Sequence, residues 1–225
     1  INSYYEERYM AEHYPEEDLV DGLPKALDYF MPPPGERDET YILYQVQQRQ
    51  NLDQAITLHS NDYTNTNYGV IVYAKTAKAF NYLEKWLGTP NFDAIMQKFY
   101  QKYAFKHVYP EDLRRHFEAE SGKWQEWFWD ELLPTTKPID YKITKVKLNT
   151  EKIGNTNYHK LTVTNKMGNT RGPYPIAAYK NDEIVHSVWY DGFGGEMEVL
   201  FPAGDYDYFR IDPARVVPEI DRTNN

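Results

Sequence analysis

The spacing of apolar side chains divides the chain into two parts. Up to about Leu133 they recur with the period of amphipathic helices, and beyond Pro138 they alternate as in β-strands. The six residues from Leu133 to Pro138 are rich in proline and follow neither period. The sequence therefore predicts a helical domain over residues 1–135 and an all-β domain over residues 138–225.

The clearest helix is expected over residues 91–104. Six of its apolar residues fall on one stripe that should face a core: Phe92, Ile95, Met96, Phe99, Tyr100 and Tyr103. A second helix is expected over residues 69–87, closed by Gly88 with a positive φ. Its apolar side would hold Tyr73, Ala77, Phe80, Leu83 and Leu87, and its polar side Lys75, Lys78, Glu84 and Lys85. Other helices are expected over residues 1–9, 110–121 and 124–132 and, in one or two pieces, over 40–58, with a loop over 22–39.

Short runs with strand composition fill the second part: 139–148, 158–165, 174–180, 184–190, 196–201 and 206–211. Turn-forming residues separate them, for example Lys180-Asn181-Asp182 and Met167-Gly168-Asn169. Because no helical pattern lies between the runs, they predict an antiparallel β-sandwich of immunoglobulin-like type. The expected fold class is thus α plus all-β, in two domains.

Composition excludes some classes of function. The net charge of −9 argues against a nucleic-acid partner, since phosphate binding needs a basic surface. No apolar run is long enough for a membrane-spanning helix, and the absence of cysteine excludes disulfides and thiolate chemistry. Acidic residues greatly outnumber basic ones in residues 1–40. Such a run is usually a solvated surface, although it would also attract cationic substrates such as a peptide's free amino terminus.

The residues suggest no metal site. None of the six histidines forms the H-E-x-x-H pattern, which places two imidazoles on one helical face. His107 and His116 are close enough in sequence to meet, but surface or core histidine is the better interpretation. There is also no G-x-S-x-G motif for a serine nucleophile.

Two tyrosines remain as candidates. Tyr68 and Tyr73 bracket the start of the helix expected over 69–87, where Gly69 would let the backbone approach a neighbour closely. A phenol can donate a hydrogen bond to a developing oxyanion. Among 21 tyrosines, however, packing is the commoner role, so the residues alone leave both interpretations open.

These segments resemble the zinc aminopeptidase family of aminopeptidase N and leukotriene hydrolase, in its shorter bacterial form. Residues 1–9 (INSYYEERY) are similar to the segment that follows W-x-D/N-E-G, whose glutamate is the third zinc ligand in that family. Tyr73-Ala74-Lys75-Thr76 resembles the family's Y-x-K-G, with threonine in place of glycine, and Tyr68 matches its second, earlier tyrosine. The later helices follow the family's spacing to about residue 135.

The resemblance implies a helical C-terminal lobe of a thermolysin-like (gluzincin) catalytic domain and release of N-terminal residues from a peptide substrate. It makes Tyr73 the catalytic phenol and Tyr68 a substrate-binding residue. Zinc would be the cofactor of the whole enzyme. Because the chain begins inside a helix and lacks H-E-x-x-H, we expect a fragment that binds no zinc and is inactive by itself. Similar bacterial members often work in the cell envelope or periplasm, but the residues do not locate this protein.

Two alternatives stay open at this stage. A non-catalytic binding module would use the helical platform and the sandwich to present an acidic surface. A hydrolase with paired carboxylates would need two acids at a fixed separation, and nothing in the sequence singles out such a pair. Apolar surface over residues 1–14 and the Tyr68–Tyr73 face is also expected to favour a non-native dimer.

Overall fold

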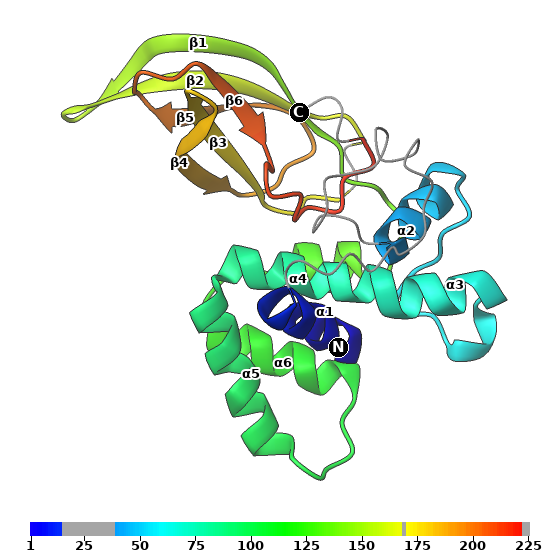
Figure 1. Ribbon diagram of the computed structural model, residues 1–225. Helices are drawn as coiled ribbons and strands as arrows, with labels where there is room; N and C mark the ends of the chain where they lie inside the picture. Colours follow the sequence, from blue (N-terminus) through cyan, green and yellow to red (C-terminus); the bar gives the residue numbers. More distant parts are fainter. Residues whose placement is uncertain (15–38, 168–169, 222–225) are drawn as a thin grey trace. The chain divides into compact units, whose positions relative to one another are not determined.

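The computed structural model describes residues 1–14, 39–167 and 170–221. Helices occupy the first part and strands the second (Figure 1). The helical elements are α1 (Asn2–His13), α2 (Glu39–Arg49), the 3₁₀ turn η2 (Ser60–Asp62), α3 (Asn65–Gly69), the π-helix η3 (Val70–Lys75), α4 (Thr76–Leu87), α5 (Thr89–Tyr103), α6 (Pro110–Ser121) and the π-helix η4 (Trp127–Leu132). The predicted α plus all-β fold class is confirmed. No helix of the described segments is long and apolar enough to cross a membrane.

Local sequence signals explain where most helices begin and end. Pro110 lies in the first turn of α6, and Gly122 ends that helix with a φ of 63° in the left-handed region. Gly88 has a φ of 86° between α4 and α5. The expected helical segment 40–58 is helical only to Arg49, and the loop expected over 22–39 lies almost entirely outside the described residues.

Burial differs from the simple amphipathic pattern at several positions. On α5, Phe92 and Ile95 are buried as expected, but Tyr100 is 67% exposed and does not belong to the core stripe. In the segment expected as one helix over 69–87, Lys75 and Glu84 are buried and Tyr73 is exposed. The prediction that Lys75 and Glu84 lie on the polar side and Tyr73 on the apolar side is therefore wrong. The π-helix η3 explains the difference for Lys75 and Tyr73. Each hydrogen-bonded ring of a π-turn contains one more residue than that of an α-helix, so the residues lie on other faces than the α-helical period predicts. Glu84 is buried because it bonds the next helix, accepting from the hydroxyl of Thr89.

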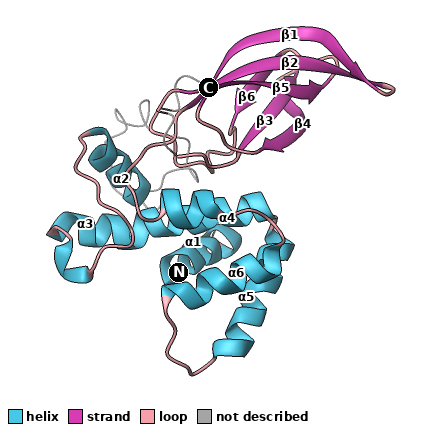
Figure 2. Ribbon diagram, turned by 180° about the vertical axis from the view of Figure 1, so that it is seen from behind, coloured by secondary structure: helices cyan, strands magenta, loops and turns pink. Residues whose placement is uncertain are grey.

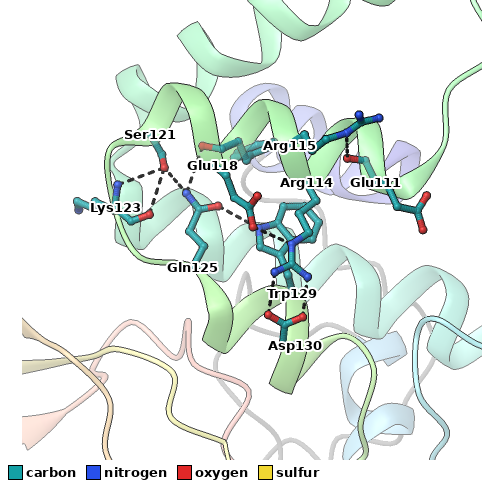
Figure 3. A network of polar contacts seen from close by, with 10 residues as sticks. Glu111, Arg114, Arg115, Glu118, Ser121, Lys123, Gln125, Trp129 and Asp130 are labelled. Atoms are coloured by element: carbon teal, nitrogen blue, oxygen red, sulfur yellow. Dashed lines mark hydrogen bonds and ion pairs between the residues drawn. The ribbon is translucent and has the colours of Figure 1, made fainter.

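A polar network holds α6 against η4 (Figure 3). The guanidinium of Arg114 donates to both carboxylate oxygens of Asp130, at 2.6 and 2.8 Å, and its Nε donates to Glu118 at 2.7 Å. The indole of Trp129 donates to the side chain of Gln125 at 3.1 Å. These contacts fix the end of the helical part before the proline-rich segment.

The second part forms two three-stranded antiparallel sheets, which confirms the predicted β-sandwich (Figure 2). One sheet has the order β1-β2-β5 and the other β4-β3-β6. The strands are β1 (Tyr141–Ile153), β2 (Thr156–Asn165), β3 (Tyr174–Lys180), β4 (Glu183–Tyr190), β5 (Gly195–Pro202) and β6 (Tyr208–Ile211). The immunoglobulin-like assignment within sandwich folds stays a prediction. Of the predicted turns, Asn181-Asp182 joins β3 to β4, and residues 168 and 169 lie outside the described part.

By their contacts the described residues group into two compact units, one within Ile1–Asn81 and Leu133–Thr136 and the other within Tyr82–Leu132 and Lys137–Asn225. Helices and strands share the second unit. The hydroxyl of the fully buried Tyr82 donates to the carbonyl of Pro173, and its ring lies 4.6 Å, centroid to centroid, from that of Trp127. The guanidinium of Arg171 pairs with the carboxylate of Glu131. The division into domains 1–135 and 138–225 stays a prediction.

Candidate functional site

The two sequence-predicted tyrosines lie side by side within the first unit. Tyr68 belongs to α3 and Tyr73 to η3, and their ring centroids are 6.3 Å apart in an edge-to-face arrangement with an interplanar angle of 72°. Tyr68 is 45% exposed and Tyr73 is 50% exposed. The structure therefore brings both rings together and leaves both phenols accessible to a molecule in solution.

The π-helix explains why residues five apart in sequence can meet. In an α-helix such residues are about 140° apart around the axis. A π-turn bonds the N–H of residue i+5 to the carbonyl of residue i, so it brings position i+5 toward the face of residue i. The amide of Thr76 makes such a bond to the carbonyl oxygen of Ile71. The π-turn thus supplies the alignment that a regular helix would not give to Tyr68 and Tyr73.

A third tyrosine extends the pair on the side of Tyr68. The ring of Tyr63 lies 6.3 Å, centroid to centroid, from that of Tyr68 at 80°. Its hydroxyl is 2.8 Å from the carbonyl oxygen of Ala55 and 2.7 Å from that of Ile56, and burial raises the pKa of this phenol. Tyr63 is therefore anchored to the segment before it and provides a fixed support for the Tyr68 ring.

The start of α3 is held by buried polar contacts to the same preceding segment. Thr64 accepts from the backbone N–H of Asn67, which caps the helix. The amide side chain of Asn67 is buried and donates to the carbonyl of Leu52 at 2.6 Å and to the side chain of Gln54 at 3.0 Å. A Cβ built at Gly69 meets no described atom within 4 Å, so no described residue is the close neighbour of this glycine, and the close approach expected there stays a prediction.

Lys75, the last residue of η3, forms a buried ionic contact. Its side chain is 4% exposed, and Nζ lies 3.3 Å from a carboxylate oxygen of Asp53, which is 5% exposed. The same nitrogen donates to the carbonyls of Gln54 at 3.1 Å and Thr135 at 3.3 Å, and it lies 5.5 Å from the ring centroid of Tyr44. Burial lowers the pKa of the Lys75 ammonium, and the nearby Asp53 opposes that shift. The contact ties η3 to two segments that are distant in sequence.

Sequence reasoning missed Lys75, Asp53 and Asn67 as parts of this arrangement. The sequence does not indicate that Lys75 and Asn67 are buried, because their partners lie in a loop that is distant in sequence. The tyrosines could be found because the motif that contains them is local. Their supports depend on tertiary contacts.

Histidines and carboxylates provide no metal centre in the described part of the chain. Within residues 1–14, 39–167 and 170–221, no three side chains of His, Cys, Asp or Glu are grouped so as to hold a metal ion. His107 is exposed, whereas His116 is buried with its Nε2 atom 2.9 Å from the carbonyl oxygen of Ile95. His107 is therefore a surface histidine and His116 a core histidine.

Comparison with known proteins places the helical part in a family. No curated protein matches the chain. A family model described as the peptidase family M1 domain matches residues 7–132, more than half of the chain. The match contains Tyr68, Tyr73 and the contacts of Lys75 with Asp53 and Gln54. The chain is therefore a member of peptidase family M1.

Proposed function

We propose that these residues belong to a zinc-dependent aminopeptidase in which Tyr73 stabilises the transition state. The observation that carries this proposal is the exposure of Tyr73. Its ring is half exposed beside Tyr68, at a position where the apolar period alone predicts burial. Membership of the peptidase family M1 supports hydrolysis of a peptide bond as the reaction.

In this proposal Tyr73 acts as a hydrogen-bond donor. When water attacks a scissile carbonyl, negative charge develops on its oxygen, and a fixed donor aimed at that oxygen lowers the barrier. A donor works best when it does not have to reorganise during the reaction. Two buried residues of the same turn surround Tyr73, Ile71 and Lys75, and Lys75 is held by its ion pair with Asp53, so the surroundings of Tyr73 meet that requirement.

Tyr68 would have a different role, in binding substrate. Its exposed ring offers an apolar face, and the edge-to-face contact with Tyr73 holds that face beside the proposed donor. A ring contact with the bound peptide would be equally strong in the ground state and the transition state. Tyr68 is therefore expected to affect KM more than kcat.

Zinc is the metal that the family implies, and the described residues do not fit it. No group of ligands is present among them, so we assign no zinc ligand to this part of the chain and derive no step through the metal. The ligands would have to come from residues outside those described. The 225 residues contain no H-E-x-x-H, and we expect them to show no hydrolysis by themselves.

The test is steady-state kinetics of the zinc-loaded enzyme that contains these residues, with aminoacyl substrates. Tyr73→Phe is expected to lower kcat by about 100- to 1000-fold, the usual loss for one oxyanion donor, with little change in KM. Tyr68→Ala, which removes the ring that would contact the peptide, should raise KM more than it lowers kcat. Tyr100→Phe is the matched control, because Tyr100 is exposed on α5 and has no proposed role. An unchanged kcat in Tyr73→Phe would refute the assignment and favour a non-catalytic binding module.

A further inference from the structure

The carbonyl oxygen of Ile71 receives two donors from one residue. The backbone N–H of Thr76 donates to it across the π-turn, and the hydroxyl of Thr76 donates to the same oxygen at 3.1 Å. In an α-helix the carbonyl of Ile71 would instead accept from the amide of Lys75. A side-chain donor on this oxygen therefore favours the wider turn over the α-helical one.

Widening the turn has a cost that the surroundings must offset. π-Turns are rare, since the wider ring gives poorer packing along the helix axis. Two side chains stabilise this π-turn. The ammonium of Lys75 contacts Asp53 and the carbonyls of Gln54 and Thr135, and the hydroxyl of Thr76 donates to the carbonyl of Ile71. Only the Thr76 contact lies within the turn itself.

The consequence falls on Tyr73, which lies between Ile71 and Thr76. If the turn closed to α-helical hydrogen bonding, Tyr73 would rotate around the helix axis relative to Tyr68. The two residues would then approach the separation of about 140° that residues five apart have in a regular α-helix. The edge-to-face contact with centroids 6.3 Å apart would then be lost. A small change in the direction of a donor reduces its effect on a transition state strongly.

We propose that Thr76 is a positioning residue, whose hydroxyl holds the π-turn open and thereby aims the phenol of Tyr73. This inference rests on the proposed function of Tyr73. Thr76 itself touches no reacting atom in this account, and it acts only through the turn.

The experiment is a double-mutant cycle in the zinc-loaded enzyme, with kcat and KM measured on one aminoacyl substrate. Thr76→Val removes the hydroxyl and keeps the shape, and it is expected to lower kcat about fivefold with KM within about twofold. Thr76→Ser keeps a hydroxyl and should restore kcat to within about twofold of the parent enzyme. In the Tyr73→Phe background, Thr76→Val should lower kcat no further, because residues that act through one group are not additive. Thr76→Ala replaces Thr76→Val if the valine variant does not fold.

A second readout does not depend on activity. Hydrogen–deuterium exchange of a peptide covering residues 70–76 should be faster in Thr76→Val than in the parent enzyme. In Thr76→Ser it should match the parent, because the hydroxyl contact is lost only in the valine variant. Equal loss of kcat in both backgrounds, no loss in Thr76→Val, or failure of Thr76→Ser to restore kcat would overturn the positioning role. If Tyr73→Phe alone leaves kcat unchanged, the role of Tyr73 fails, and the positioning role fails with it. If Tyr73→Phe is impaired while Thr76→Val is not, only the inference about Thr76 fails.

Discussion

Among single residues, Lys75 is a cation whose side chain is buried. An ammonium group loses its hydration when it is buried, and only close partners can compensate for the loss. Lys75 has a carboxylate and two carbonyls within 3.3 Å. Removing the lysine would leave the carboxylate of Asp53 buried without its cation. This makes the ion pair a sensitive point for the stability of the first unit.

Lys75→Met is expected to lower the free energy of unfolding by about 3–5 kcal/mol, the usual loss when one partner of a buried pair is removed. Chemical denaturation followed by circular dichroism measures the change. Lys98→Met is the control, because the Lys98–Glu120 ion pair is exposed and should contribute less than about 1 kcal/mol. A Lys75→Met variant as stable as the Lys98→Met variant would show that the buried pair does not support the unit.

The identity of the site tyrosines could be predicted from the sequence, but the exposure of Tyr73 could not. Tyr68 and Tyr73 belong to a short local motif, so their spacing is visible directly. Assigning faces requires a constant period of 3.6 residues, and the π-helix Val70–Lys75 interrupts that period. The same interruption moved Lys75 from the expected polar side to the interior.

At the scale of elements, predictions succeeded where local chemistry decides the backbone. The Asn181-Asp182 turn is such a case: both residues have positive φ, 51° and 63°, as a tight two-residue hairpin turn of type I′ requires. Helices α5 and α6 were predicted from apolar spacing and from their flanking proline and glycine residues. The π-turn in Val70–Lys75 was not predicted, because the apolar pattern on either side of it is regular.

The β3–β4 turn has a built-in dependence on pH. One carboxylate oxygen of Asp207 accepts from the backbone N–H of Asn181 at 2.8 Å, and the other accepts from Nζ of Lys180 at 3.0 Å. The backbone hydrogen bond, helped by Lys180, lowers the pKa of Asp207 below its ordinary value of 3.8. Since this folded-state pKa is lower than the unfolded one, the stabilisation is present above pH 3.8 and is lost as the pH falls through the lowered pKa.

The amide resonance of Asn181, followed by NMR during an acid titration, should therefore shift with a midpoint below 3.8. Asp207→Asn is the control and should remove that titration step from the Asn181 signal. A midpoint at or above 3.8 would mean that the carboxylate does not hold the turn in solution.

At the scale of the whole molecule, the second unit combines helices with the sandwich. The sandwich was predicted from the alternation of apolar residues and from the β-domain that the resemblance implies, and the family match, which ends at residue 132, does not extend to it. Its attachment to the helices had no sequence signal. The contacts that attach it come from Tyr82 and from the Arg171–Glu131 pair. A Cβ at Gly172 would lie 2.4 Å from the hydroxyl oxygen of Tyr82, which explains why no side chain is accommodated there. The expected non-native dimer stays a prediction.

Tyr82→Phe is expected to destabilise the helices and the sandwich of this unit together. It removes the donor to the Pro173 carbonyl inside a buried contact, at a cost of about 1–3 kcal/mol. The rings of Trp127 and Trp189 lie near that of Tyr82, so tryptophan fluorescence reports on this contact. Fluorescence and far-ultraviolet circular dichroism should show the same unfolding transition, shifted by the same amount. Tyr100→Phe, at an exposed position, should change the free energy of unfolding by less than about 0.5 kcal/mol. Separate transitions for helices and strands would contradict this account.

As an oxyanion donor, Tyr73 should bind the transition state more tightly than the substrate. The affinity of the Tyr73→Phe enzyme for two inhibitors measures this difference: one is a tetrahedral phosphinic peptide analogue, the other a planar, uncleaved peptide amide. A donor used only in the transition state should weaken binding of the tetrahedral analogue by about 100-fold, in line with the loss in kcat, and leave the planar one within about threefold. Equal weakening of both inhibitors, or no weakening of either, would contradict the claim.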